Sequence, residues 1–360
     1  LGSSFLTACG SDSSTSGTTT EDGGPASGTL RISNWPLYMA DGFIAEFQTA
    51  SGITVDYKED FNDNEQWFAK VKEPLSRKQD IGADLAVPTS FLAVRLHQLG
   101  WLNDISDEGV PNKKNIRPDL LEASVDPPGR KFSAPPYMSG LVGIAYNRAA
   151  TGRDIRTIDD LWDPAFKGRV SLFSDAQDGL GMIMLSQATR RRTRPPRVSS
   201  RRSTWFGNRT TWARSAGSPA TTTPTTSLQA TSRWHRHIRV TWCSCRPTIP
   251  TSSSSFPTRG GTTFVDTMVI PYTTQNQRAA EAWINYVYDK PNYAKLVAYT
   301  QFVPVLSDMT AELEKVDPAA ASNPLINPPK DVLDRSKGWA ALTDEQTQEY
   351  NTAYAAVTGG

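Results

Sequence analysis

Residues 30–38 read Leu30-Arg31-Ile32-Ser33-Asn34-Trp35-Pro36-Leu37-Tyr38. The apolar positions alternate as in a β-strand, and the Asn-Trp-Pro sequence then breaks the pattern. We therefore expect Trp35 and Tyr38 on the loop at the carboxyl end of this strand, where open α/β domains bind ligands. Two aromatic faces and a phenol suit a cation carried on an aliphatic stem, although both rings could instead cap a core.

Predicted strands and helices alternate from Leu30 to Leu102. After the first strand come a helix with Phe43, Ile44 and Phe47 on one face, and then a strand, a helix and a strand at residues 53–57, 64–75 and 84–88. This βαβ order predicts a parallel sheet. The last of these strands ends in Pro88-Thr89-Ser90-Phe91, which again places hydroxyl groups and an aromatic ring at a carboxyl end.

Length and charge indicate two lobes and an acidic body. A chain of 360 residues is longer than one core usually serves. The formal net charge of +1 averages two unlike parts, because residues 188–261 hold 14 Arg and no Lys, Asp or Glu. The remainder therefore has 24 basic and 37 acidic residues, a balance that attracts cations. No apolar run is long enough for a membrane-spanning helix, and three Cys define no disulfide framework.

The amino-terminal stretch has the features of an exported, anchored protein. Leu6-Thr7-Ala8-Cys9 resembles a bacterial lipobox, where a signal peptide is cut and the Cys thiol is lipidated. Residues 10–28 are rich in Ser, Thr and Gly and offer little to bury, as in a flexible tether. We expect residues 1–28 to be a clipped signal end, the lipid-bearing Cys9 and a tether that holds the protein at the outer face of a membrane.

A series of motifs in one order resembles the polyamine-binding receptors of bacterial ABC importers. The series comprises SNWPLY, FQTASGITV, DLAVPTSF, the Pro-rich stretch before GLVGIAYN, DLWDPAFKGRV, SDAQD and FVDTMVIP. The resemblance implies a two-lobed α/β fold of the type II periplasmic-binding-protein class, with a hinge between the lobes. It implies one lobe from residues 29–138 plus 266–303, and a second from residues 139–265 plus 304–360.

The same resemblance implies a ligand site made of aromatic rings and carboxylates. Ammonium groups need carboxylates spaced along a slot, and the methylenes between them need aromatic walls. The implied ligand-binding residues are Trp35, Tyr38, Ser90, Phe91, Asp175, Asp178, Phe264, Asp266 and Trp339. The implied partners are spermidine or putrescine and a membrane permease, with a monomeric receptor, no nucleic acid, no metal and no cofactor.

Several carboxylates and rings have a second reading. Asp175 could cap a helix whose dipole Asp178 supports, and Trp339 could pack in a core. Asp266 lies in an apolar strand, where an unpaired acid is costly, so a binding role is favoured. Asp175 and Asp178 could also serve an exported carbohydrate-active enzyme as general acid and base, but no His, Cys or Ser stands in a nucleophile motif. A receptor of the same class for another cationic or small organic solute is the third alternative.

Residues 189–259 do not match the rest of the chain. They are rich in Arg, Thr and Pro and resemble GC-rich coding sequence read in a neighbouring frame, because SPATTTPTTS, STWFGNRTTWARSAG and PTSSSSFPTRGG all allow ordinary helix or strand sequence in that frame. We therefore interpret the run as the product of two compensating frame errors, rather than as a nucleic-acid-binding arm. The His235-x-His237 and Cys243-x-Cys245 pairs have poor spacing for zinc. We expect the run to be irregular.

Overall fold

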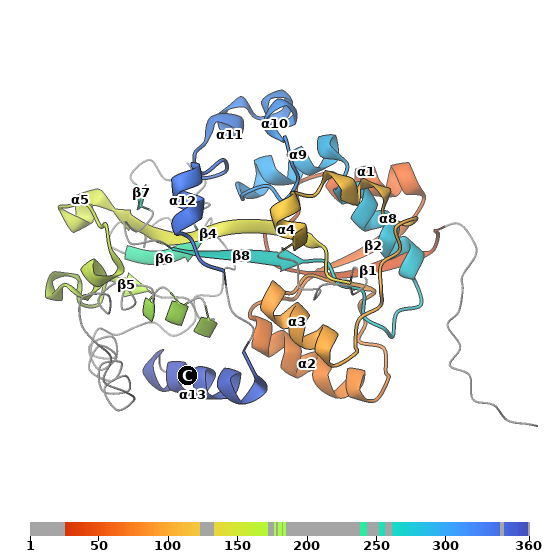
Figure 1. The fold of residues 1–360 in the computed structure, drawn as a ribbon, viewed down its shortest axis with the longest axis horizontal. Helices are drawn as coiled ribbons and strands as arrows, with labels where there is room; N and C mark the ends of the chain where they lie inside the picture. Colours follow the sequence, from red (N-terminus) through yellow and green to blue (C-terminus); the bar gives the residue numbers. More distant parts are fainter. Residues whose placement is uncertain are drawn as a thin grey trace, which may run out of the picture.

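The computed structural model describes residues 26–122, 133–171, 176–177, 179–181, 183–184, 238–242, 252–255, 261–338 and 342–358. The described strands form a three-stranded sheet and a five-stranded sheet, which lie side by side along the molecule with helices around them (Figure 1). The α/β class and the division of the strands into two sheets agree with the sequence-based expectation.

The three-stranded sheet is built from the motif that opens the fold. Its strands are β1 (Thr29–Asn34), β2 (Thr54–Glu59) and β3 (Leu85–Ala86), in the order β2-β1-β3, and both pairings are parallel. Helices α1 (Phe43–Ser51) and α2 (Asn64–Ser76) connect the strands, as their patterns predicted. In Figure 1, α1 and α2 lie on opposite faces of this sheet. Because β1 and β3 are parallel neighbours, their carboxyl ends lie at the same end of the sheet.

The second sheet is organised around β4 (Pro136–Asn147), a strand whose twelve residues are all buried. The antiparallel β8 (Thr262–Thr267) pairs with the first half of β4, and β6 (Ile238–Trp242) and β7 (Ser252–Ser255) pair with the second half. The short β5 (Val170–Ser171) runs parallel to β6. Met138 is paired with Asp266, so the predicted lobe boundaries at residues 138 and 266 fall inside the paired strands β4 and β8.

The expectation that residues 189–259 are irregular is wrong for two short segments, because β6 and β7 lie within that range. Both pair with the same part of β4, from Ile144 to Tyr146, and therefore lie on opposite edges of it. Strand pairing uses backbone N–H and C=O groups, and every residue except Pro supplies both. A segment of almost any amino-acid composition can therefore pair with an exposed strand edge. His235, His237, Cys243 and Cys245 lie outside the described residues.

The remaining helices surround the two sheets. They are α3 (Ser90–Gln98), α4 (Pro118–Glu122), α5 (Arg148–Thr151), α8 (Gln277–Val287), α9 (Lys290–Thr300), α10 (Thr310–Val316), α11 (Pro318–Ser322), α12 (Lys330–Arg335) and α13 (Asp344–Thr358), with 3-10 turns η1 (Pro111–Asn115), η2 (Ile158–Trp162) and η3 (Pro164–Phe166). Among the helices that the structure describes, none has the length and apolar character needed to cross a bilayer.

The carboxyl-terminal segment packs against elements of both sheets. The expected second lobe includes residues 304–360, but the start of this segment packs beside the first sheet's helices, where α10 contacts α9 and Arg117 N donates to Val305 O at 2.9 Å. Further along, Lys337 pairs with the start of β8, and Tyr354 of α13 packs against Leu180. The chain therefore returns to the second sheet only after α11.

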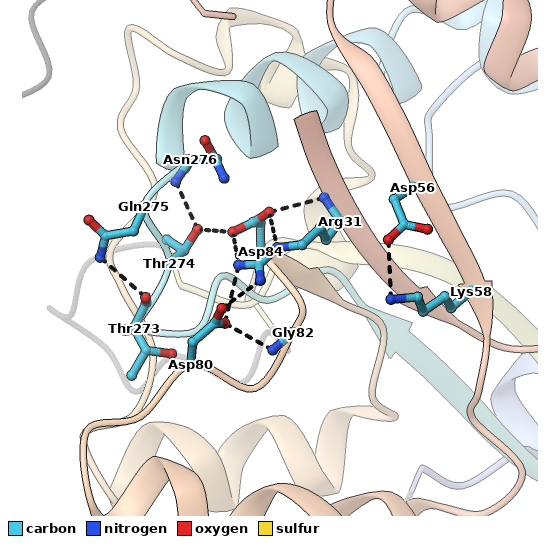
Figure 2. A network of polar contacts seen from close by, with 10 residues as sticks. All are labelled: Arg31, Asp56, Lys58, Asp80, Gly82, Asp84, Thr273, Thr274, Gln275 and Asn276. Atoms are coloured by element: carbon cyan, nitrogen blue, oxygen red, sulfur yellow. Dashed lines mark hydrogen bonds and ion pairs between the residues drawn. The ribbon is translucent and has the colours of Figure 1, made fainter. Parts of the chain in front are cut away.

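A buried ion pair stabilises the first sheet away from the carboxyl ends of its strands. The Asp84 carboxylate, which is fully buried, accepts hydrogen bonds from the backbone N, Nε and Nη2 of Arg31 at 2.8–3.0 Å, and from Thr274 Oγ1 at 2.8 Å (Figure 2). Asp80 binds the same guanidinium from its exposed side. This network ties β1 to the segments that precede β3 and α8, and it lies at the end of β1 remote from Trp35 and Tyr38.

Candidate functional site

The turn after β1 is held by contacts to both neighbouring strands. Trp35 Nε1 donates to Val87 O, just beyond β3, at 2.8 Å. Leu37 has a left-handed backbone conformation, with φ of 64°, and its N donates to Glu59 Oε1 at the end of β2 at 3.2 Å. Because a Leu in this region of φ costs about 1–2 kcal/mol, these contacts stabilise a turn that local preference alone would not form.

The carboxylate of Asp266, on β8, lies against this turn. Tyr38 Oη donates to Asp266 Oδ2 at 2.8 Å, and Thr89 Oγ1 donates to Asp266 Oδ1 at 2.7 Å. Thr89, just after β3, is also bridged to Asp266 through the backbone. The three residues come from the carboxyl ends of β1, β3 and β8, so the site forms where the two sheets meet.

The electrostatics of Asp266 are unusual for a buried acid. The residue is 1 % exposed, and burial raises the pKa of its carboxyl to about 6, although the hydrogen bonds from Thr89 and Tyr38 lower that pKa in part. Within the part of the chain that the structure describes, no Lys, Arg or His is bonded to Asp266. A buried carboxylate held only by hydroxyl groups is a strong site for an added cation.

Aromatic rings form a continuous row beside this carboxylate. The ring of Phe302 makes edge contacts with Tyr38 and Phe264, at centroid distances of 5.3 and 5.4 Å. The row continues from Tyr38 to Trp35 at 6.3 Å, and from Trp35 to Phe61 at 5.1 Å. Trp35 packs against both main hydrophobic clusters and is only partly buried, so part of the indole remains accessible.

The structure brings together four of the predicted ligand residues, namely Trp35, Tyr38, Phe264 and Asp266. Phe264 is almost fully buried, with its ring against Gly140 and Phe302, so it supports the row from inside. The binding role that the sequence predicts for these residues stays a prediction.

The other predicted site residues have different positions. Ser90 begins α3 and is half-buried, and Phe91 packs against the cluster that contains Phe61 and Trp67. The rest of the predicted set lies outside the described residues: Asp175, Asp178, Trp339 and the lipid-bearing Cys9. Residues 176–177, 179–181 and 183–184 are helical, as the sequence predicted for the stretch that follows Asp175.

Three residues of the site were missed by reasoning from sequence. Of the Thr89-Ser90 pair, the sequence favoured Ser90, but the structure directs Thr89 to Asp266. Asn64 is bonded to Thr89, and Phe302 packs between Tyr38 and Phe264. The hydroxyl pair at the end of β3 was a usable signal for Thr89, whereas no local pattern marks Asn64 or Phe302, which arrive from α2 and from the end of α9.

Comparisons with known proteins give matches over most of the chain. The family described as "Bacterial extracellular solute-binding protein" matches residues 42–328. The chain is 26% identical over 353 residues to the spermidine/putrescine-binding periplasmic protein 1 of Haemophilus influenzae, covering 97% of this chain and 94% of that protein. It is 24% identical to the spermidine/putrescine-binding periplasmic protein of Escherichia coli, covering 92% of each chain.

A solved structure shows the same fold. A putative spermidine/putrescine ABC transporter protein from Listeria monocytogenes superposes with a TM-score of 0.74 at 21% identity, covering 91% of this chain and 98% of that one. At this identity the likeness establishes the fold alone. That fold is the two-lobed α/β architecture of type II periplasmic binding proteins, which confirms the fold class expected from the sequence.

Proposed function

Since this chain belongs to the bacterial extracellular solute-binding proteins, we propose that it captures a polyamine outside the cytoplasmic membrane and delivers it to an ABC permease. The relatives that match over most of their length carry spermidine and putrescine in their names. The protein itself performs no chemistry in this proposal, and the ligand leaves unchanged.

The observation that carries the proposal is the Asp266 carboxylate. It is buried, it is bonded only to the hydroxyl groups of Tyr38 and Thr89 among the described residues, and aromatic rings stand beside it. A protonated amine supplies the missing positive charge, and the aliphatic stem of a polyamine packs against aromatic faces. A carbohydrate or another neutral solute offers the carboxylate no such compensation.

In this proposal the second lobe also contributes to the ligand site, and a lipid anchors the receptor. Asp175, Asp178 and Trp339 contribute from the second lobe, with Ser90 and Phe91 at the edge of the site. The two lobes close on the ligand about the paired strands β4 and β8. Cys9 carries a lipid that holds a monomeric receptor at the membrane surface, in the periplasm or at the outer face.

Calorimetry tests the function directly. Spermidine, putrescine and an uncharged diol of matching length are titrated into the chain as written and into a version in which residues 189–259 are restored to the neighbouring reading frame. We expect the restored protein to bind both amines and not the diol. Equal affinity for the diol would reject the assignment, and tight binding of a different small cation alone would shift it to another solute of the same class.

A further inference from the structure

Asn64, the first residue of α2, is buried, and both polar atoms of its side-chain amide form hydrogen bonds to Thr89. Its Oδ1 accepts from Thr89 N at 3.1 Å, and its Nδ2 donates to Thr89 Oγ1 at 3.1 Å. The backbone N–H of Thr89 can only donate, so the orientation of the Asn64 amide is determined by the first bond. The second bond then occupies the Thr89 hydroxyl oxygen as an acceptor.

The direction of the next hydrogen bond follows from this arrangement. A hydroxyl group has a single proton, and Asn64 already donates to the oxygen of Thr89, so the Thr89 proton has to be directed elsewhere. It points to Asp266 Oδ1 at 2.7 Å. Asn64 therefore donates to Thr89, and Thr89 donates in turn to the carboxylate of Asp266.

We propose that Asn64 is a positioning residue of the candidate site, which acts through Thr89 to hold the Asp266 carboxylate in one orientation and in the ionised form that an ammonium group requires. If Asp266 took up a proton, the new O–H would be a donor at a group that already faces two donors, Thr89 and Tyr38. This inference rests on the proposed function, since it assigns the ligand amine to Asp266.

Burial raises the pKa of Asp266, and this network opposes that shift. Among the described residues, the titratable groups that interact with Asp266 are the phenol of Tyr38, on the turn after β1, and that of Tyr137, on β4. Burial raises the pKa of Tyr137 far above neutrality, and its hydroxyl donates to Tyr38 O, so this phenol carries no charge at neutral pH. From α2 and the segment before α3 come the neutral side chains of Asn64 and Thr89.

The first test measures the pKa of Asp266 without any ligand. The carboxyl resonance of Asp266 is followed by carbon-13 NMR in the full ligand-free chain, and it is assigned by its loss in Asp266→Asn. Thr89→Val removes the hydroxyl but keeps the shape, and we expect it to raise the pKa of Asp266 by about one unit. Thr89→Ser keeps the hydroxyl and should restore a value close to that of the unsubstituted chain.

The second test asks whether Asn64 acts through Thr89. Asn64→Leu should raise the pKa of Asp266 in the chain that retains Thr89, and it should add almost nothing in the Thr89→Val background, since the group through which it acts is then absent. Asn115→Leu is the matched control, because it removes a comparable amide bond, to Tyr288 O, in η1. It should leave the pKa of Asp266 unchanged.

The outcomes separate this inference from the proposed function. An unchanged Asp266 pKa in Thr89→Val, or effects of Asn64→Leu that are equal in the two backgrounds, would overturn the positioning role. If that role holds while the frame-restored protein fails to bind spermidine at pH 8, the proposed function fails by itself. If both hold, Thr89→Val in the restored protein should lose about fivefold more affinity for spermidine at pH 6 than at pH 8.

Discussion

The phenol of Tyr38 and the carboxylate of Asp266 are joined by a 2.8 Å hydrogen bond, although 228 residues of chain separate them. Tyr38 belongs to the turn that follows β1, and Asp266 to β8, a strand of the second sheet. The bond is therefore a contact between the two sheets. A change at either residue should be felt in both ligand binding and stability.

Asp266→Asn should stabilise the ligand-free protein at neutral pH while it abolishes polyamine binding. The pKa of Asp266 is raised from 3.8 to about 6, so the ionised form costs about 3 kcal/mol relative to the unfolded chain at pH 7. Asn has the same shape, retains an acceptor for Thr89 and carries no charge, but its amide nitrogen replaces the oxygen that accepts from Tyr38 Oη. Urea unfolding at pH 7 should show a gain of about 1–2 kcal/mol, because the lost hydrogen bond from Tyr38 offsets part of the relief. Calorimetry on the frame-restored version with this substitution should show no spermidine binding.

The pH dependence gives this prediction its control. Because the folded pKa of Asp266 exceeds the unfolded one, the folded state holds more protons between pH 4 and 6, so this residue adds stability as the pH falls through that window. The advantage of the Asn variant should therefore shrink toward pH 4. A pH-independent gain at Asp266 would contradict the account.

Asp84→Asn should destabilise the first sheet without touching the candidate site. Burial by itself raises the pKa of Asp84, but the hydrogen bonds from Arg31 and Thr274 outweigh it and leave that pKa below its ordinary value. Removing one partner of a buried ion pair costs about 3 kcal/mol, because the guanidinium of Arg31 loses its inner carboxylate. The loss should be present above pH 4 and should fade as the pH drops below it, since the wild-type Asp84 is then protonated too.

Asp80→Asn provides the matched comparison on the same guanidinium. The Asp80 side chain is 53% exposed, so its ion pair with Arg31 is screened by water and should contribute less than about 1 kcal/mol. Both variants are compared by chemical denaturation at pH 7. Equal losses at the two positions would show that burial does not decide the strength of this network.

Gly140→Ala should distort the aromatic row through Phe264. A Cβ atom at residue 140 would clash with Cε1 of Phe264, whose ring is buried and in contact with Phe302. Overpacking of this kind costs about 1–3 kcal/mol. In the double variant with Phe264→Leu the clash is relieved, so the two losses in unfolding free energy should be clearly less than additive. Strict additivity would place the strain elsewhere.

The anomalous run from 189 to 259 should decide whether the chain as written binds ligand. It holds 14 Arg and no acidic residue, so it adds positive charge to a protein proposed to bind cations. We expect spermidine affinity to be weak or absent in the chain as written and to appear on frame restoration. Equal tight binding by both would show that the frame hypothesis is wrong, as would a continuous frame in natural relatives.

The sequence by itself determined the α/β class and the order of the elements in the first half of the chain. The spacing of Phe43 and Phe47 predicted α1, and the alternation before Trp35 predicted β1, because both signals depend only on which residues face a core over one or two turns. The Asn-Trp-Pro break in the alternating pattern also predicted correctly that Trp35 and Tyr38 follow the end of β1. Motif resemblance added Asp266, which periodicity could mark only as an acid in an apolar strand.

Only the tertiary structure decided which groups meet. Thr89, rather than Ser90, reaches Asp266, and Asn64 orients that hydroxyl from another helix, because strand ends that are remote in sequence converge where the sheets adjoin. The strands β6 and β7 form although the amino-acid composition of their segment predicts irregular structure. They form because β4 offers backbone donors and acceptors on both edges, and strand pairing uses the backbone rather than the side chains. Local sequence sets what each segment prefers, whereas burial and backbone pairing between distant segments decide which preferences are realised.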